Sequence, residues 1–292
     1  MREHICTGKG TFVRLLALAF ALVLLLGDGL AAAAAPAHGV TIPNFWDPKR
    51  RVERPAAGAV TAIRFITTDD FPPFNFLDAG GRLTGFNVDL ARAICSELAV
   101  PCTIQTRPWN DLVTALKNKT ADAAIAGIAI SEAARVDLDF SDPYLRSPAR
   151  FIERREAATF DPTDGGLKGR AVAVVAGTAH EAYLATLFPE VDRRSFPNAD
   201  AARQALKTGQ VVAAFGDGIQ LSVWLESEAA EKCCVFVGGP YLDSRYFGEG
   251  MAVAVPNGSS DLKRAINTAL ESLHAKGVYD ELYLRYFPIS FY

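Results

Sequence analysis

The sequence has no apolar run long enough to cross a membrane. Its longest, Leu15 to Leu26, covers 12 residues, whereas a helix across a ~30 Å hydrocarbon core needs about 20. An excess of positive charge is missing as well, because 30 Lys and Arg stand against 33 Asp and Glu, for a formal net charge of −3. This balance argues against nucleic-acid binding, which requires a basic face to neutralise phosphates.

Groups of metal-binding or catalytic residues are also scarce. No C-x-x-C motif occurs, and the histidines of the main part of the chain, His38, His180 and His274, are far apart. Structural zinc sites need four Cys or His ligands at short spacings. No catalytic triad is recognisable either. The sequence therefore predicts neither a metal site nor a cofactor.

The N-terminal segment has the order of a secretory signal peptide. Three basic residues precede the apolar run, and the small residues Ala31 to Ala37 that follow it contain A-x-A cleavage patterns. We expect residues 1–35 to be cleaved off; the alternative is a membrane anchor, for which the run is short. No cysteine lies near the cleavage region, which argues against lipoprotein attachment. The remaining ~257 residues suggest two domains working in the periplasm.

From residue 61 the chain alternates short apolar runs with helical patterns. We expect an α/β architecture with mostly parallel sheets. A Pro-rich arm over 36–60 precedes it, either loosely packed or a partner site. The predicted strands are 63–67, 102–106, 121–130, 171–175, 211–215 and 251–255. The predicted helices are 87–98 with Asn87 as cap, 111–117, a short one from Ser131, one opened by 177–179, 201–207 with Asp200 as cap, 260–275 and a final segment 279–287.

Four cysteines remain after the leader, which contains Cys6. Cys95 lies on a helical pattern, and Cys102 follows the turn after that helix. A disulfide between them suits this spacing and an oxidising compartment, with free buried thiols as the alternative. Cys233 and Cys234 are adjacent, and the sequence leaves open whether they are free or form a vicinal bridge.

A set of short motifs in a fixed order carries a family resemblance. They are Phe71-Pro72-Pro73-Phe74, Gly85-Phe86-Asn87-Val88-Asp89-Leu90, Ala126-Gly127-Ile128, Asp139-Phe140-Ser141-Asp142-Pro143-Tyr144, Gly177-Thr178, Tyr246-Phe247-Gly248-Glu249-Gly250, and Gly277-Val278-Tyr279-Asp280 with Tyr286-Phe287. Over about residues 61–290 the chain resembles the extracytoplasmic solute-binding proteins of polar amino-acid ABC transporters (bacterial solute-binding protein family 3). The Cys95–Cys102 spacing is similar to a disulfide in some members.

The resemblance implies the two-lobed type II periplasmic-binding-protein fold. One lobe would comprise 61–149 and 249–292, the other 150–248, joined by hinge strands near 150–153 and 247–250. A small molecule, an amino acid or a related amine or derivative, would bind in the cleft, and hinge closure would bury it. The partner would be the permease of an ABC importer, and the protein would be a monomer.

The resemblance also implies which residues bind the ligand. A buried zwitterion needs an anion for its ammonium group and donors for its carboxylate. Asp217 corresponds to the family's ammonium-binding Asp; a turn-forming Asp-Gly is the alternative interpretation. Phe71 and Trp109 correspond to the aromatic residues that sandwich the ligand. Beside them, Asp69 and Asp70 could add an acidic contact, with a solvated loop as the alternative for each. Gly127 and Thr178 belong to the motifs that line the cleft.

The chain departs from the family where the ligand carboxylate is held. Ala129 and Ala134 take the places of the usual hydroxyl residue and Arg, and Ala179 replaces a second hydroxyl. Arg135 lies one residue late, which on a helix turns its side chain by about 100°. Either Arg135 is redirected, with backbone N–H groups at Thr178 assisting, or the ligand lacks an ordinary α-carboxylate and is an amine or a derivative stacked on aromatic rings.

Two other functions remain open at this point. The same scaffold is known to host a periplasmic dehydratase of aromatic amino-acid biosynthesis, for which His180 or Glu181 would have to act as acid or base in the cleft. A ligand-sensing module that acts through a membrane receptor is the other. We expect a binding protein rather than an enzyme.

Overall fold

The protein is described from a computed structural model. The structure describes residues 40–45, 53, 55–56, 58–128, 130–157, 161–162, 165–287 and 289–292. The predicted signal peptide, Ala129 and about half of the predicted arm lie outside the described residues. Within the arm, Val40, Ile42 and Phe45 pack against the core of the first sheet. No helix of the described part is long and apolar enough to span a membrane.

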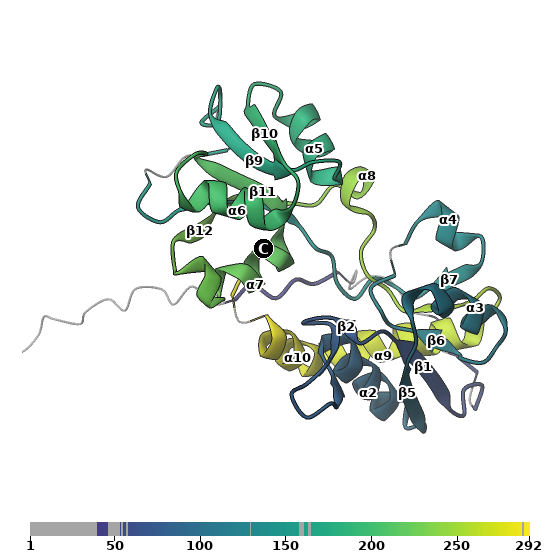
Figure 1. Ribbon diagram of the computed structural model, residues 1–292. Coiled ribbons are helices and arrows are strands. Elements are labelled where there is room, and N and C mark those ends of the chain that lie inside the picture. Colours follow the sequence, from purple (N-terminus) through teal and green to yellow (C-terminus); the bar gives the residue numbers. More distant parts are fainter. Residues whose placement is uncertain are drawn as a thin grey trace, which may run out of the picture. The chain divides into compact units, whose positions relative to one another are not determined.

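Two five-stranded sheets form the framework (Figure 1). The first has the order β5-β1-β6-β13-β7, and the second has the order β10-β9-β11-β8-β12; a small sheet has the order β2-β3-β4. The strands are β1 (Ile63–Thr67), β2 (Asp70–Phe71), β3 (Asn75–Leu77), β4 (Leu83–Thr84), β5 (Cys102–Thr106), β6 (Ala123–Ala124), β7 (Leu138–Phe140), β8 (Ala149–Arg154), β9 (Ala171–Val175), β10 (Asp192–Phe196), β11 (Ala213–Asp217), β12 (Cys234–Tyr241) and β13 (Ala254–Pro256).

The sheets are mixed rather than mostly parallel, so that prediction was wrong. β1 runs parallel to β5 and β6, and β9 runs parallel to β10 and β11. β8 and β13 pair antiparallel with their neighbours. β8 follows β7 of the first sheet and β13 follows β12 of the second. Because neither arrives over a helical crossover of its own sheet, neither is constrained to run parallel.

The predicted helices are present close to their expected ranges, whereas α7 (Gly218–Leu225) and α8 (Ser244–Phe247) were not predicted. The others are α2 (Phe86–Leu98), α3 (Leu112–Lys117), α4 (Glu132–Arg135), α5 (Ala179–Leu187), α6 (Ala199–Lys207), α9 (Ser260–Ala275) and α10 (Val278–Tyr286), with 3₁₀ turns η1 (Trp109–Asp111) and η2 (Glu228–Ala230). The structure confirms Ser131 as the residue before α4, where its hydroxyl accepts from the Ala134 N–H.

Two predicted helix caps were wrong. Gly85, not Asn87, precedes α2. A side chain at residue 85 would meet the Phe74 carbonyl oxygen at 2.3 Å, so this position requires glycine. Asn87 is buried instead, and its amide donates to Asn75 Oδ1 at 2.8 Å. In α6 the cap is Asn198, whose Oδ1 accepts from the Ala201 N–H at 2.9 Å, while Asp200 lies in the exposed first turn.

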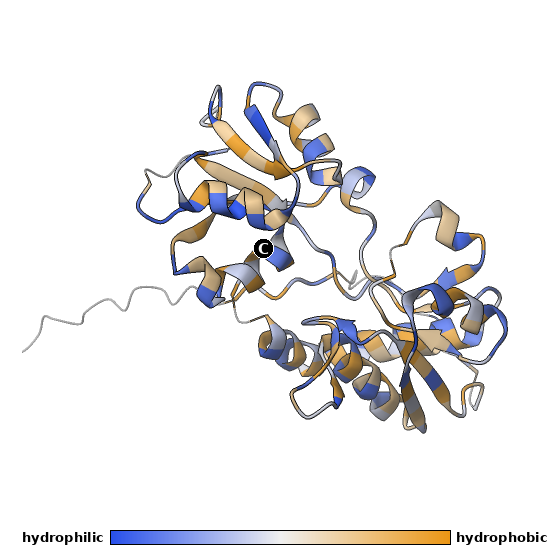
Figure 2. Ribbon diagram, viewed as in Figure 1, coloured by the Kyte–Doolittle hydropathy of each residue, from blue (hydrophilic) through white to orange (hydrophobic). Residues whose placement is uncertain are grey.

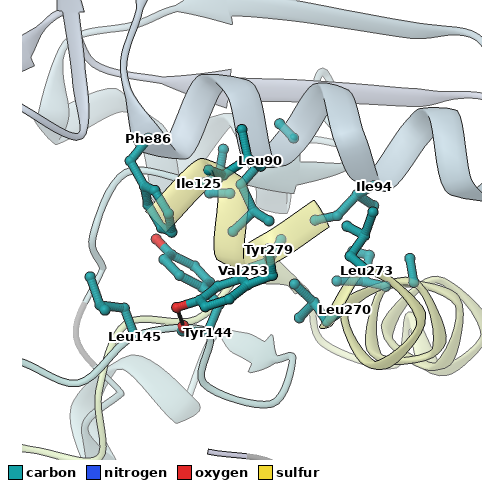
Figure 3. Close-up of a cluster of buried hydrophobic side chains, with 14 of the residues drawn as sticks. Phe86, Leu90, Ile94, Ile125, Tyr144, Leu145, Val253, Leu270, Leu273 and Tyr279 are labelled. Atoms are coloured by element: carbon teal, nitrogen blue, oxygen red, sulfur yellow. Dashed lines mark hydrogen bonds between the residues drawn. The ribbon is translucent and has the colours of Figure 1, made fainter. Parts of the chain in front are cut away.

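Each sheet carries its own core. In the first, α2, α9 and α10 bring aromatic and aliphatic side chains onto β1, β6 and the segment before β13, as Figure 3 shows around Phe86, Tyr144 and Tyr279. In the second, β9 is apolar whereas β10 at the sheet edge is hydrophilic (Figure 2). Charged residues on an edge strand discourage pairing with other chains, which accounts for the composition of β10.

The predicted disulfide Cys95–Cys102 is present, with 6.1 Å between the Cα atoms. It joins the C-terminal part of α2 to the start of β5. Of the two alternatives for Cys233 and Cys234, the structure shows the vicinal disulfide, at the start of β12.

Removing the Cys95–Cys102 bridge should lower the free energy of unfolding by about 2–3 kcal/mol, because it closes a short loop of the unfolded chain. We expect a Cys95→Ala/Cys102→Ala variant to show this loss in urea denaturation. Reductant should then destabilise the wild type more than the variant, since the vicinal bridge closes almost no loop. Equal stability of wild type and variant would contradict this prediction.

Candidate functional site

A cavity of about 400 Å³ lies at the carboxyl ends of strands in the second sheet. Strands β9 and β11 end there, and helices α5, α6 and α7 begin there. In sheets with parallel strands this edge is where ligands commonly bind, because loops and helix N-termini converge on it. We call it the strand-end cavity, and it is lined by Val175, Thr178, His180, Pro197, Asn198, Ala199, Ala202, Arg203, Ala214, Phe215, Gly216, Asp217, Gln220 and Leu221.

A second cavity of about 430 Å³ shares Arg203, Asp217 and Gln220 with the first. It reaches the loop Phe71–Phe74, and we call it the loop cavity. Its other lining residues are Asp200, Ile219, Val223, Trp224, Ser227, Ala229 and Met251. Because they share these residues of α6 and of the start of α7, the two cavities are adjacent.

Asp217 is the last residue of β11 and the N-cap of α7. Its Oδ1 accepts from the Gln220 N–H at 2.8 Å, and its Oδ2 accepts from the Ser147 hydroxyl at 2.5 Å. The turn-forming role considered from the sequence is therefore real, and the carboxylate also lines both cavities. Neither neutral donor cancels its negative charge.

His180 lies beside this carboxylate. Its ring stacks on Phe247 at 5.1 Å between centroids and meets Phe215 edge-on. Burial lowers the pKa of His180 more than the negative charge of Asp217 raises it. A neutral imidazole at pH 7 leaves the charge of Asp217 available to a cationic group.

Thr178 and Glu181 organise the start of α5. The Thr178 hydroxyl accepts from the Glu181 N–H at 3.2 Å and donates to the Val175 carbonyl at 2.7 Å. The Glu181 carboxylate accepts from the Gly177 N–H at 2.8 Å, which resembles a capping box. Hydrogen bonding to Ser195 is the main cause that lowers the pKa of Glu181. Ala179, the first residue of the helix, offers no hydroxyl.

Phe71 enters the loop cavity against a glycine. Its ring stacks on Phe74 at 4.8 Å, and a side chain at Gly127 would approach the Phe71 ring to 2.9 Å. Gly127 also has φ +74°, where L-residues are strained. Gly127 and Phe71, two of the predicted site residues, are thus in contact, and Gly127 leaves room for the Phe71 ring.

Five other predicted site residues do not line either cavity. Trp109 is 54% exposed on η1, and Asp70 is exposed. Arg135, the last residue of α4, forms an ion pair with Glu249 at 2.9 Å. Among the described residues, Trp109, Asp70, Arg135, Gly127 and Ala179 are not part of either lining. Ala129 lies outside the described residues, so its role stays a prediction.

The cavities also contain residues that the sequence did not reveal. Arg203, Gln220 and Trp224 lie on helices and look like ordinary helical positions, and Met251 stands between glycine and alanine. Trp224 lacks a sequence signal as well, because its helix α7 contains no charged residue. Within the described part of the chain, no group of three or more His, Cys, Asp or Glu is placed to hold a metal ion.

Comparison with known proteins adds a family match. The family model of bacterial extracellular solute-binding proteins, family 3, matches residues 63–289. The L-arginine-binding protein of Pseudomonas aeruginosa is 31% identical over 240 residues, covering 82% of this chain and 92% of that protein. The lysine/arginine/ornithine-binding periplasmic protein of Escherichia coli is 31% identical over 232 residues, covering 79% and 89%.

A solved structure supports the architecture. The L-cystine solute receptor of Neisseria gonorrhoeae, in its unliganded open conformation, has a TM-score of 0.69 at 18% identity, covering 79% of this chain and 94% of that one. At this identity the likeness concerns the fold alone. It confirms the two-lobed α/β fold predicted from the motifs.

Proposed function

The chain belongs to the bacterial extracellular solute-binding proteins of family 3, and from this premise we propose that it binds an amino acid or a closely related small molecule for an ABC importer. The observation that carries the proposal is the Asp217 carboxylate, which lines both cavities and whose hydrogen-bond donors among the described residues, the Gln220 N–H and the Ser147 hydroxyl, are neutral. An ammonium group is the ligand feature that such a carboxylate recognises. The relatives named above bind arginine, lysine or ornithine, which supports an amino acid.

The proposed binding mode uses both lobes. We assign residues 61–149 and 249–292 to one lobe and 150–248 to the other. Asp217 and Thr178 would act from the second lobe, while Phe71 and Trp109 would cover the ligand from the first. Gly127 would make room for Phe71. Arg135 would have to leave Glu249, at 2.9 Å, before it could hold a ligand carboxylate.

The proposed cellular role follows from the family. After cleavage of residues 1–35 the monomeric protein would work in the periplasm and deliver its ligand to a permease. It would return the ligand unchanged and need no cofactor. Glu181 supports this assignment, because its carboxylate accepts hydrogen bonds from the Gly177 N–H and the Ser195 hydroxyl and is therefore engaged in the structure of the lobe.

A thermal-shift screen of the protein without residues 1–35 tests the proposal. The compounds are L-arginine, L-lysine, L-ornithine, L-histidine, uncharged amino acids, amines, opines and small organic acids. A ligand at ~100 times its dissociation constant stabilises the folded state by about 2.7 kcal/mol, which should raise the melting temperature by several degrees. We expect a hit among compounds that carry an ammonium group.

Two results would count against the proposal. A screen in which no ammonium compound raises the melting temperature would remove its basis. Turnover of a prephenate-like acid, followed by absorbance of the product, would favour the dehydratase alternative instead.

A further inference from the structure

Arg203 is a cation that faces the proposed ligand. It lies on α6 and lines both the strand-end cavity and the loop cavity, together with Asp217. Its guanidinium lies over the Trp224 ring, 5.6 Å from the centroid. The ring restricts the orientation of the planar guanidinium, so the Arg203 side chain loses less conformational entropy when a ligand binds to it.

The charge of Arg203 is poorly compensated. Its side chain is only 16% exposed, and among the described residues its buried Nε has no hydrogen-bond partner. The ion-pair partner Asp200 lies at 3.3 Å but is 92% exposed, so water screens it. By contrast, Arg154 of the same lobe donates to the carbonyls of Leu206 and Val211 at 3.0 and 3.1 Å. A buried guanidinium with this little compensation is costly unless a partner of opposite charge reaches it.

A structural role explains this arrangement less well than a binding role. An Arg that served only to pack against Trp224 would not need to line a cavity, and an Arg that served to pair with Asp200 would not need to be buried. A carboxylate in the cavity would compensate the charge through the Nη groups of the guanidinium, because guanidinium and carboxylate form short, charge-assisted hydrogen bonds.

We propose that Arg203 binds a carboxylate of the ligand and so replaces the arginine that Ala134 lacks. This inference rests on the proposed function and narrows it: Asp217 and Arg203 offer opposite charges to one molecule, so the ligand is an amino acid rather than an amine. The carboxylate is either the α-carboxylate or one on the ligand side chain, and the two are separated by experiment.

Isothermal titration calorimetry with matched compounds tests the inference. L-arginine, L-ornithine and L-histidine are compared with agmatine, putrescine and histamine, which lack the α-carboxylate; L-glutamate is compared with L-glutamine for a side-chain carboxylate. We expect the wild type to prefer the carboxylate member of at least one pair by about 30-fold or more. The pair that shows the preference identifies which carboxylate is bound.

Variants then assign the preference to Arg203. Arg203→Met should lower affinity for the carboxylate member by about 30-fold or more and change affinity for its partner by less than about threefold. Arg203→Lys should retain part of the preference. Lys207→Met is the matched control, because Lys207 lies one turn further along α6, is 18% exposed, pairs with Glu231 and lines neither cavity. Circular dichroism melting checks that each variant is folded.

The outcomes separate this inference from the function beneath it. A wild type that binds the amines as tightly as the amino acids would overturn the inference and leave solute binding intact. Equal losses for both members of a pair in Arg203→Met, or a loss no larger than in Lys207→Met, would overturn it as well. A wild type that binds none of the compounds would remove the proposed function and the inference together.

Discussion

An Asp217→Asn variant is expected to bind its amino-acid ligand about 30-fold or more weakly than the wild type, with little change in melting temperature. Removing one charge from a buried, hydrogen-bonded charge pair costs about 2–5 kcal/mol of binding free energy. Asparagine is as good an N-cap as aspartate, so α7 keeps its acceptor for the Gln220 N–H. The Ser147 hydroxyl can turn to accept from the new amide. Calorimetry measures the affinity, and thermal melting measures the stability.

Asp243→Asn is the control for this variant. Asp243 caps α8 in the same way, with Oδ1 accepting from the Arg245 N–H at 3.0 Å, and it lines neither cavity of the described structure. It should bind ligand like the wild type. If Asp217→Asn also binds within about threefold of the wild type, Asp217 is only a helix cap and the ammonium site lies elsewhere.

Phe86→Ala should lower the free energy of unfolding by about 3–5 kcal/mol, which is typical for removing a large aromatic ring from a core. Phe86 is fully buried and meets the rings of Tyr279 and Phe287 at 5.9 and 5.3 Å between centroids. Figure 3 shows its ring directed toward Tyr144. Urea denaturation gives the free energy.

The same substitution should also affect the loop cavity, because a series of ring contacts connects Phe86 to it. Phe86 packs edge-on against Phe74, which stacks on Phe71 of the loop cavity. We therefore expect weaker ligand binding along with the lost stability. Leu284→Ala, at a 44% exposed position of α10, is the control and should cost less than about 1 kcal/mol. A loss of that small size in Phe86→Ala would show that the core repacks around the cavity left by the ring.

Local sequence patterns were sufficient for many elements. The strands 63–67, 102–106 and 171–175 and the helix 260–275 have the predicted bounds. Where a strand is short or charged the pattern failed: among the described residues of the apolar run 121–130, the strand β6 covers Ala123–Ala124 alone, and β10 was not predicted because its charges lie on a sheet edge. Hydrophobic periodicity detects an element through its buried face, and an edge strand with charged side chains has little apolar surface to bury.

The sequence alone determined the family and the two-lobed fold, because the order and spacing of the motifs can be read without any tertiary structure. The cap at Gly85 and the mixed strand directions were decided by contacts between distant segments, such as Phe74 with Gly85. So was the exposure of Arg203 to a cavity. A buried arginine and a solvated one can occupy the same position in a helical sequence pattern. Only the packing of Trp224 and of the strand ends around Arg203 shows that this arginine is buried and lines a cavity.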